Sequence, residues 1–156
     1  MTPDEIRAAI SADPALQALV PDTQAIADAL SAGRTKVVSR MTSARGLASL
    51  LPGGPLQAEM ILLKLEATRD ALLASTDPSE KLMGAMLRRQ LDFLSRDGLD
   101  FGDVALRGMI EQLGAQGVLT TDEVAAIKTI GVVPDPVNEY NVRIAVHYNA
   151  DGTRAE

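Results

Sequence analysis

The chain has 156 residues, a formal net charge of −6 and 46% hydrophobic residues, which excludes a chain that is disordered throughout. Aromatic residues make up only 3% and Trp is absent, so the core has to be built from aliphatic side chains. The lack of Cys excludes a disulfide framework and thiolate chemistry, and the acidic balance argues against general nucleic-acid binding.

The first 33 residues predict three short helices. Thr2-Pro3-Asp4-Glu5 has the order of a capping box, with a capping hydroxyl, a proline in the first turn and a glutamate that reaches back. Asp13-Pro14 and Pro21-Asp22 each start a further helix, and Gly33 is a stop signal. This pattern indicates a compact helical cap.

A basic segment follows, because no acidic residue lies between Asp28 and Glu59. Its cations are Arg34, Lys36, Arg40 and Arg45. Such a cluster suits phosphate groups or an acidic partner surface, but we favour a solvated or intersubunit face over nucleic-acid binding. We take these four residues as a candidate partner or intersubunit site, and we do not expect nucleic acid as the partner.

The centre of the chain, Pro55–Arg96, predicts two long helices joined by a short turn at Ser75–Pro78. Asp77 is a good N-cap and Pro78 suits a first helical position. In the first helix, the predicted apolar stripe is Leu56, Met60, Leu63, Ala67 and Ala71, and it is widened by Leu62, Leu65, Leu72 and Leu73. The short connection makes the helices antiparallel, so the predicted fold class is mostly α, a helical bundle built on a central αα-hairpin over residues 55–96.

Two more helices are predicted after this hairpin. One runs from about Asp103 to Gln116 and stops at Gly117. The next begins with a second capping box at Thr120–Glu123 and ends at Gly131.

The pattern changes after Gly131, where two prolines two positions apart force extended geometry. A period of two then places four side chains on one face of a predicted strand over residues 141–149: Val142, Ile144, Val146 and Tyr148. A lone strand has no ladder partner within the chain, so we expect this arm to pair with another subunit or protein by strand addition. A frayed or self-folded tail is the alternative. The predicted division is a helical domain, 1–131, and an extended arm, 132–156.

No residue pattern predicts catalysis, a cofactor or a metal site. His147 is the only histidine, which rules out a zinc-type cluster of His and Cys. Asp97, Asp100 and Asp103 lack the EF-hand order and are interpreted as a turn and a helix cap. No glycine-rich loop has the phosphate-binding order and no serine has a nearby base, so we do not expect an enzyme.

Parts of the chain resemble a known class of proteins. The segments that carry the resemblance are Met1–Glu5, Ala12–Leu16, Ala25–Val38 and Pro134–Val137. They are similar to small proteins encoded in the virion-structural gene clusters of tailed bacteriophages. The resemblance covers about the first 45 residues and implies a virion component of the neck or tail, with no site residues attached to it. The predicted C-terminal strand departs from the short helical ending of such proteins.

The predicted function is therefore a non-enzymatic virion subunit of a tailed bacteriophage. It is expected in the neck or tail, as a head–tail connector, an adaptor or a tail-associated ring, assembling through helical faces and the strand arm. A soluble assembly chaperone or adaptor and a helical nucleic-acid-binding module using Arg34–Arg45 are the alternatives. No signal peptide or transmembrane segment is recognised, which is consistent with a virion protein made in the host cytoplasm.

Overall fold

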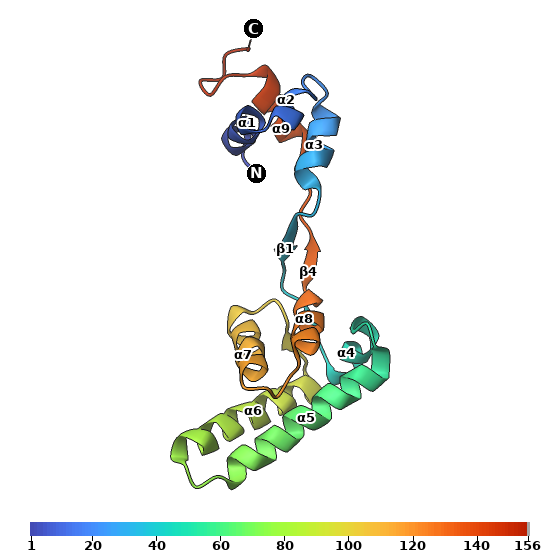
Figure 1. Cartoon of the computed structure of the whole chain (residues 1–156), viewed down its shortest axis with the longest axis vertical. Helices are drawn as coiled ribbons and strands as arrows, with labels where there is room; N and C mark the ends of the chain where they lie inside the picture. Colours follow the sequence, from blue (N-terminus) through green and yellow to red (C-terminus); the bar gives the residue numbers. More distant parts are fainter. Residues whose placement is uncertain (156) are drawn as a thin grey trace. The chain divides into compact units, whose positions relative to one another are not determined.

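The structure is a computed structural model that describes residues 1–155, and the chain is mostly helical (Figure 1). The helices are α1 (Pro3–Ala12), α2 (Pro14–Gln17), α3 (Thr23–Ser31), α4 (Ala44–Leu50), α5 (Gly54–Ala74), α6 (Pro78–Arg96), α7 (Val104–Ala115), α8 (Thr121–Thr129) and α9 (Glu139–His147). The short strands are β1 (Thr35–Val37), β2 (Met41–Thr42), β3 (Leu99–Asp100) and β4 (Val132–Pro134). β1 pairs with β4, and β2 pairs antiparallel with β3.

The predicted helix starts are confirmed by their caps. Thr2 and Thr120 each form a complete capping box with the glutamate three residues on, at α1 and α8. Asp13 caps α2 and Asp77 caps α6, in each case ahead of a proline in the first turn. Ser43 caps α4 by accepting a hydrogen bond from the Gly46 backbone. These starts depend on local hydrogen bonds, which is why the sequence is sufficient to locate them.

The chain divides into two compact units, residues 1–36 with 133–156 and residues 37–132. This division differs from the predicted helical domain of 1–131 with a separate arm. The difference arises because the C-terminal segment does not extend away from the body. It returns to the N-terminal helices and completes their core.

The first unit is built from α1, α2, α3 and α9 (Figure 1). Its core consists of Ile6, Ile26, Ala27, Val137, Val142 and Ala145. Ile6, Ile26 and Val142 are each fully buried. One hydrophobic core therefore joins residues from the two ends of the chain.

The predicted C-terminal strand over 141–149 is wrong, because residues 139–147 form helix α9. The Asn138 side chain accepts a hydrogen bond from the Tyr140 backbone and starts the helix. The buried residues are Val142 and Ala145, three positions apart, with Val146 packed beside them. The alternating β-branched residues imitated a strand, while the side chains that pack follow the helical spacing.

The second unit contains the two long helices. α5 and α6 are joined by Ser75–Asp77 and run side by side in opposite directions (Figure 1). They are in close contact at Gly84, where an added Cβ would lie 2.9 Å from the Leu73 backbone nitrogen and 3.0 Å from the Leu72 Cβ. Only glycine fits this contact, which fixes the side of α6 that faces α5.

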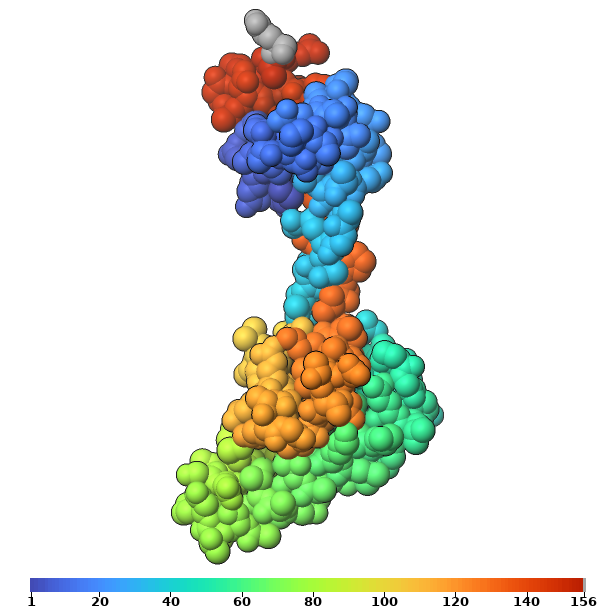
Figure 2. Space-filling model, viewed as in Figure 1, coloured from blue at the N-terminus to red at the C-terminus, as the bar shows by residue number. Residues whose placement is uncertain are grey.

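α4, α7 and α8 complete the second unit around this pair of helices. In Figure 2 the orange segments of α7 and α8 leave much of the green and yellow-green surface of α5 and α6 uncovered. The buried core here is aliphatic apart from one aromatic ring, that of Phe101, as the composition requires. Within residues 1–155, no helix has both the length and the apolar composition needed to cross a membrane.

The burial of Val142 gives a direct test of this fold. We predict that Val142→Ala lowers the free energy of unfolding of the first unit by about 2 kcal/mol, because a fully buried valine loses its packing. Tyr140→Ala is the matched control on α9, since Tyr140 is 62% exposed, and it should change stability by no more than about 0.5 kcal/mol. Urea denaturation followed by circular dichroism measures both. Equal, negligible effects of the two substitutions would contradict the helical packing of α9.

Candidate interaction surface

The four predicted basic residues do not form one cluster. Arg34 and Lys36 belong to the first unit, where both contact the carboxylate of Asp135, at 2.9 Å and 3.3 Å. Arg40 and Arg45 belong to the second unit and are exposed. Two of the four cations thus have an acidic partner within their own unit.

Asp135 contacts the basic segment through both its side chain and its backbone. Its side chain receives a hydrogen bond from Arg34, and its backbone N–H donates to the Arg34 carbonyl at 3.1 Å. Hydrogen bonds from Arg34 and then Lys36 hold the pKa of Asp135 below the ordinary value of an aspartate. These contacts join the start of the basic segment to the residues before α9. Arg34 and Lys36 therefore have a structural role.

Three of the residues predicted to form a strand, Val142, Ile144 and Val146, lie on helix α9, and Tyr148 directly follows it. Val142 is fully buried in the first unit, and Ile144 and Val146 are partly buried. Tyr148 is 44% exposed, and its carbonyl accepts a hydrogen bond from the Arg7 side chain at 3.1 Å. Val142 therefore cannot be offered to another chain while this unit is folded.

The aspartates considered for calcium have local partners, as the sequence interpretation proposed. Asp97 is the C-cap of α6, and Asp103 is the N-cap of α7. Asp100 accepts hydrogen bonds from the Ser39 hydroxyl at 2.6 Å and from the backbone of Arg40 and Gly102. Its pKa is lowered by these bonds, of which that from Ser39 has the largest effect. Within residues 1–155 there is no group of three or more His, Asp or Glu side chains placed to hold a metal ion.

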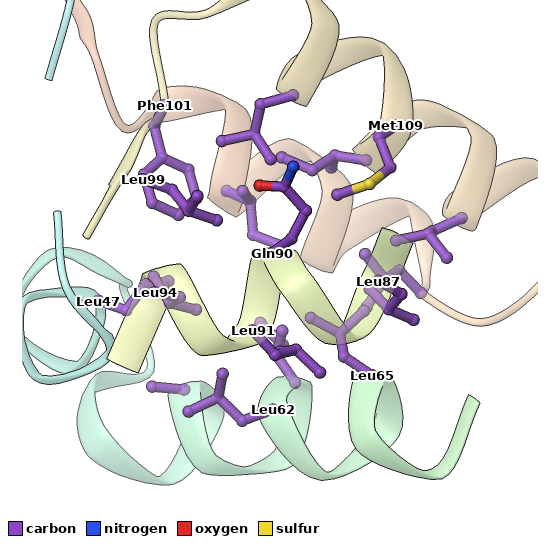
Figure 3. Close-up of a pocket in the computed structure, with 17 residues that line it drawn as sticks. Leu47, Leu62, Leu65, Leu87, Gln90, Leu91, Leu94, Leu99, Phe101 and Met109 are labelled. Carbon is purple, nitrogen blue, oxygen red and sulfur yellow. The ribbon is translucent and has the colours of Figure 1, made fainter. Parts of the chain in front are cut away.

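An internal cavity of about 40 Å³ lies between the long helices and α7 (Figure 3). In Figure 3, Leu62 and Leu65 of α5 point toward Leu87 and Leu91 of α6. Gln90 is the only polar side chain among the lining residues. A cavity with apolar walls and one amide has no set of converging polar groups for chemistry, so we interpret it as part of the core.

A second correction concerns the face of α5 that is buried. The central line of the predicted stripe is exposed, with Leu56 at 73%, Met60 at 49% and Leu63 at 55% exposure. Three of the residues predicted to widen it, Leu62, Leu65 and Leu72, do pack inward, together with Ala58 and Ile61. The exposed stripe follows a spacing of four and three residues, which is the spacing of a helix–helix contact line. We call it the α5 seam: Leu56, Met60, Leu63, Ala67 and Asp70.

Helix α6 has an exposed stripe with the same spacing. Leu82 is 63% exposed, Met86 58% and Phe93 38%. Two arginines complete the line, and the Arg89 guanidinium lies over the Phe93 ring at 5.4 Å. We call it the α6 seam: Leu82, Met86, Arg89, Phe93 and Arg96.

The two seams differ in their charged residues. The α5 seam contains Asp70, which pairs with Arg69, and is bordered by the exposed side chains of Glu59 and Glu66. Neither glutamate has an ion-pair partner within the described residues. The α6 seam contains Arg89 and Arg96, which are likewise without an ion-pair partner among residues 1–155, and is bordered by one exposed acid, Asp92. The balance is therefore acidic along the α5 seam and basic along the α6 seam. Contiguous exposed apolar residues with a charged border are typical of a protein interaction surface.

The two seams are the candidate interaction residues that the sequence pattern did not identify. Their spacing was visible, but α5 has apolar residues on more than one face, and the pattern alone does not say which face meets the core. The sequence did hold one signal: α5 has more apolar residues than a single packing face can use. A long helix with two apolar faces needs two packing partners, and this chain supplies one.

No protein-family model, curated protein or solved structure matches the chain. The function therefore has to be argued from the surfaces themselves.

One partly buried ion pair joins α8 to α5. The Lys64 ammonium donates to both carboxylate oxygens of Glu123, at 2.7 and 2.9 Å, and Glu123 is only 7% exposed. Burial acts to raise the pKa of Glu123, but hydrogen bonds from Lys64 and Thr120 outweigh it and leave that pKa below its ordinary value. The pair therefore stabilises the folded chain when Glu123 is ionised.

This pair predicts a pH dependence of stability. Because the folded pKa of Glu123 is lowered, its contribution is complete above the ordinary pKa of a glutamate and is lost as the pH falls through the lowered value. Glu123→Gln should therefore reduce stability at neutral pH and flatten the acid side of the profile. Denaturation at a series of pH values measures this, with the exposed Glu66→Gln as control. An acid slope in Glu123→Gln as steep as that of the unchanged chain would contradict the assignment.

Proposed function

We propose that the chain is a non-enzymatic structural subunit of a tailed-bacteriophage virion, located in the neck or tail and assembling through helical faces. The observation that carries the proposal is the pair of exposed seams on α5 and α6. A chain that works alone gains nothing from large apolar side chains in water along two long helices, whereas a subunit of an assembly buries them.

The segments that carry the phage resemblance lie mostly in the first unit. The resembling segments lie far apart in sequence, yet Arg34 bonds to Asp135 and the Ser31 hydroxyl accepts a hydrogen bond from the Val137 backbone at 2.8 Å. The resemblance thus falls largely on one folded unit. Helix α9 also gives the chain the helical ending that the resemblance implies.

The polar groups of the chain support a structural role more than a catalytic one. Glu123, the most buried carboxylate in the described part, is bound to Lys64, and the Ser39 hydroxyl is bound to Asp100. Side chains held in this way maintain the fold and are not poised for proton transfer or attack. In this proposal α4 to α8 form a helical bundle around the α5–α6 pair, which serves as the scaffold for assembly.

The proposal is tested by the composition of the particle. We predict that mass spectrometry of gradient-purified virions, from cells that carry the gene in its native genome, detects the chain at a constant ratio to the major tail or neck proteins. A nonstructural enzyme from the same lysate serves as the control for carry-over. Absence from the particle, with abundant protein in the lysate, would contradict the proposal and favour a soluble assembly chaperone.

A further inference from the structure

The α5 seam and the α6 seam lie on opposite sides of the α5–α6 pair. Residues two positions apart on a helix differ in direction by about 200°. Leu65 points toward α6 (Figure 3), so Leu63 and Ala67 point away from it. Gly84 contacts α5, so Leu82 and Met86 point away from α5. Each long helix therefore packs its inner face on the other helix and presents its seam outward.

The two seams match each other in spacing and in length. Both follow the four-and-three spacing that allows two helices to pack along a common line. The α5 seam extends over 15 residues, 56–70, and the α6 seam over 15 residues, 82–96. Either seam is long enough to cover the other along its whole length.

The charges on the seams favour contact between unlike seams. Two α5 seams in contact would bring Glu59, Glu66 and Asp70 of one copy close to the same acids of the next. Two α6 seams in contact would bring Arg89 and Arg96 together with their equivalents. Contact between an α5 seam and an α6 seam places acids beside arginines and apolar residues beside apolar residues.

We propose that a second copy of this chain is the partner, and that the α5 seam of one copy docks head-to-tail on the α6 seam of the next. This inference rests on the proposed function and specifies its partner and polarity. A contact between two different surfaces repeats from copy to copy, so it generates a ring if the rotation closes and a filament if it does not. Each internal copy then uses both seams, which accounts for the exposure of both.

Blocking one seam at a time tests the polarity. Leu63→Glu adds a charge at the centre of the α5 seam, and Arg89→Glu reverses the charge at the centre of the α6 seam. Both side chains are exposed, so circular dichroism should show unchanged folding. Each variant alone should require about a thirtyfold higher concentration to self-associate than the unchanged chain. Val104→Glu is the matched control, because Val104 is 83% exposed on α7 and lies outside both seams.

The decisive measurement is native mass spectrometry of the two variants mixed in equal amounts. A Leu63→Glu chain keeps its α6 seam and an Arg89→Glu chain keeps its α5 seam, so the mixture should form one-to-one heterodimers that cannot grow. Three results would overturn the inference: an unchanged chain that stays monomeric at its highest soluble concentration, a single variant that forms dimers at the same concentration as the unchanged chain, or a mixture that stays monomeric.

The results of this self-association experiment can be distinguished from those of the mass spectrometry of purified virions. A chain found in virions but monomeric or two-fold symmetric in solution would defeat the head-to-tail inference alone. A chain that assembles head-to-tail but is absent from virions would defeat the proposed function alone.

Discussion

The contact between α5 and α6 at Gly84 is the constraint that determines which residues of the two long helices are exposed. A side chain at position 84 would collide with the backbone of α5, so glycine sets both the separation and the facing sides of the two helices. Once those sides are fixed, the helical repeat determines what remains outside. The outward residues are the α5 and α6 seams, and their exposure follows from the packing of the inner faces.

Local features of the fold were predictable from the sequence, because caps and prolines act over three or four residues. Thr2, Asp77 and Thr120 start helices where expected. The two failures concern choices that tertiary packing makes. Residues 139–147 satisfied a strand pattern but are helical because Val142 and Ala145 fill the core beside α1 and α3. The predicted stripe of α5 was centred on the outer face because either face was apolar enough to be the inner one.

Only part of the candidate interaction surface could be predicted from the sequence, because the rest depends on tertiary packing. The basic segment was recognised, but the sequence did not show that Asp135, a hundred residues away, binds Arg34 and Lys36. The α5 and α6 seams became apparent only once burial separated the inner from the outer faces of these helices. The first unit joins the two ends of the chain, and the second carries both seams.

Cysteine cross-linking tests the head-to-tail contact most directly, because the chain contains no Cys of its own. A chain with Leu63→Cys and a chain with Arg89→Cys are mixed and oxidised, and each is also oxidised alone; the two positions are the centres of the two seams. The account predicts rapid disulfide formation between the two different chains and slow formation within either sample alone. Efficient cross-linking of Leu63→Cys with itself, or of Arg89→Cys with itself, would contradict it, because like seams would then be in contact.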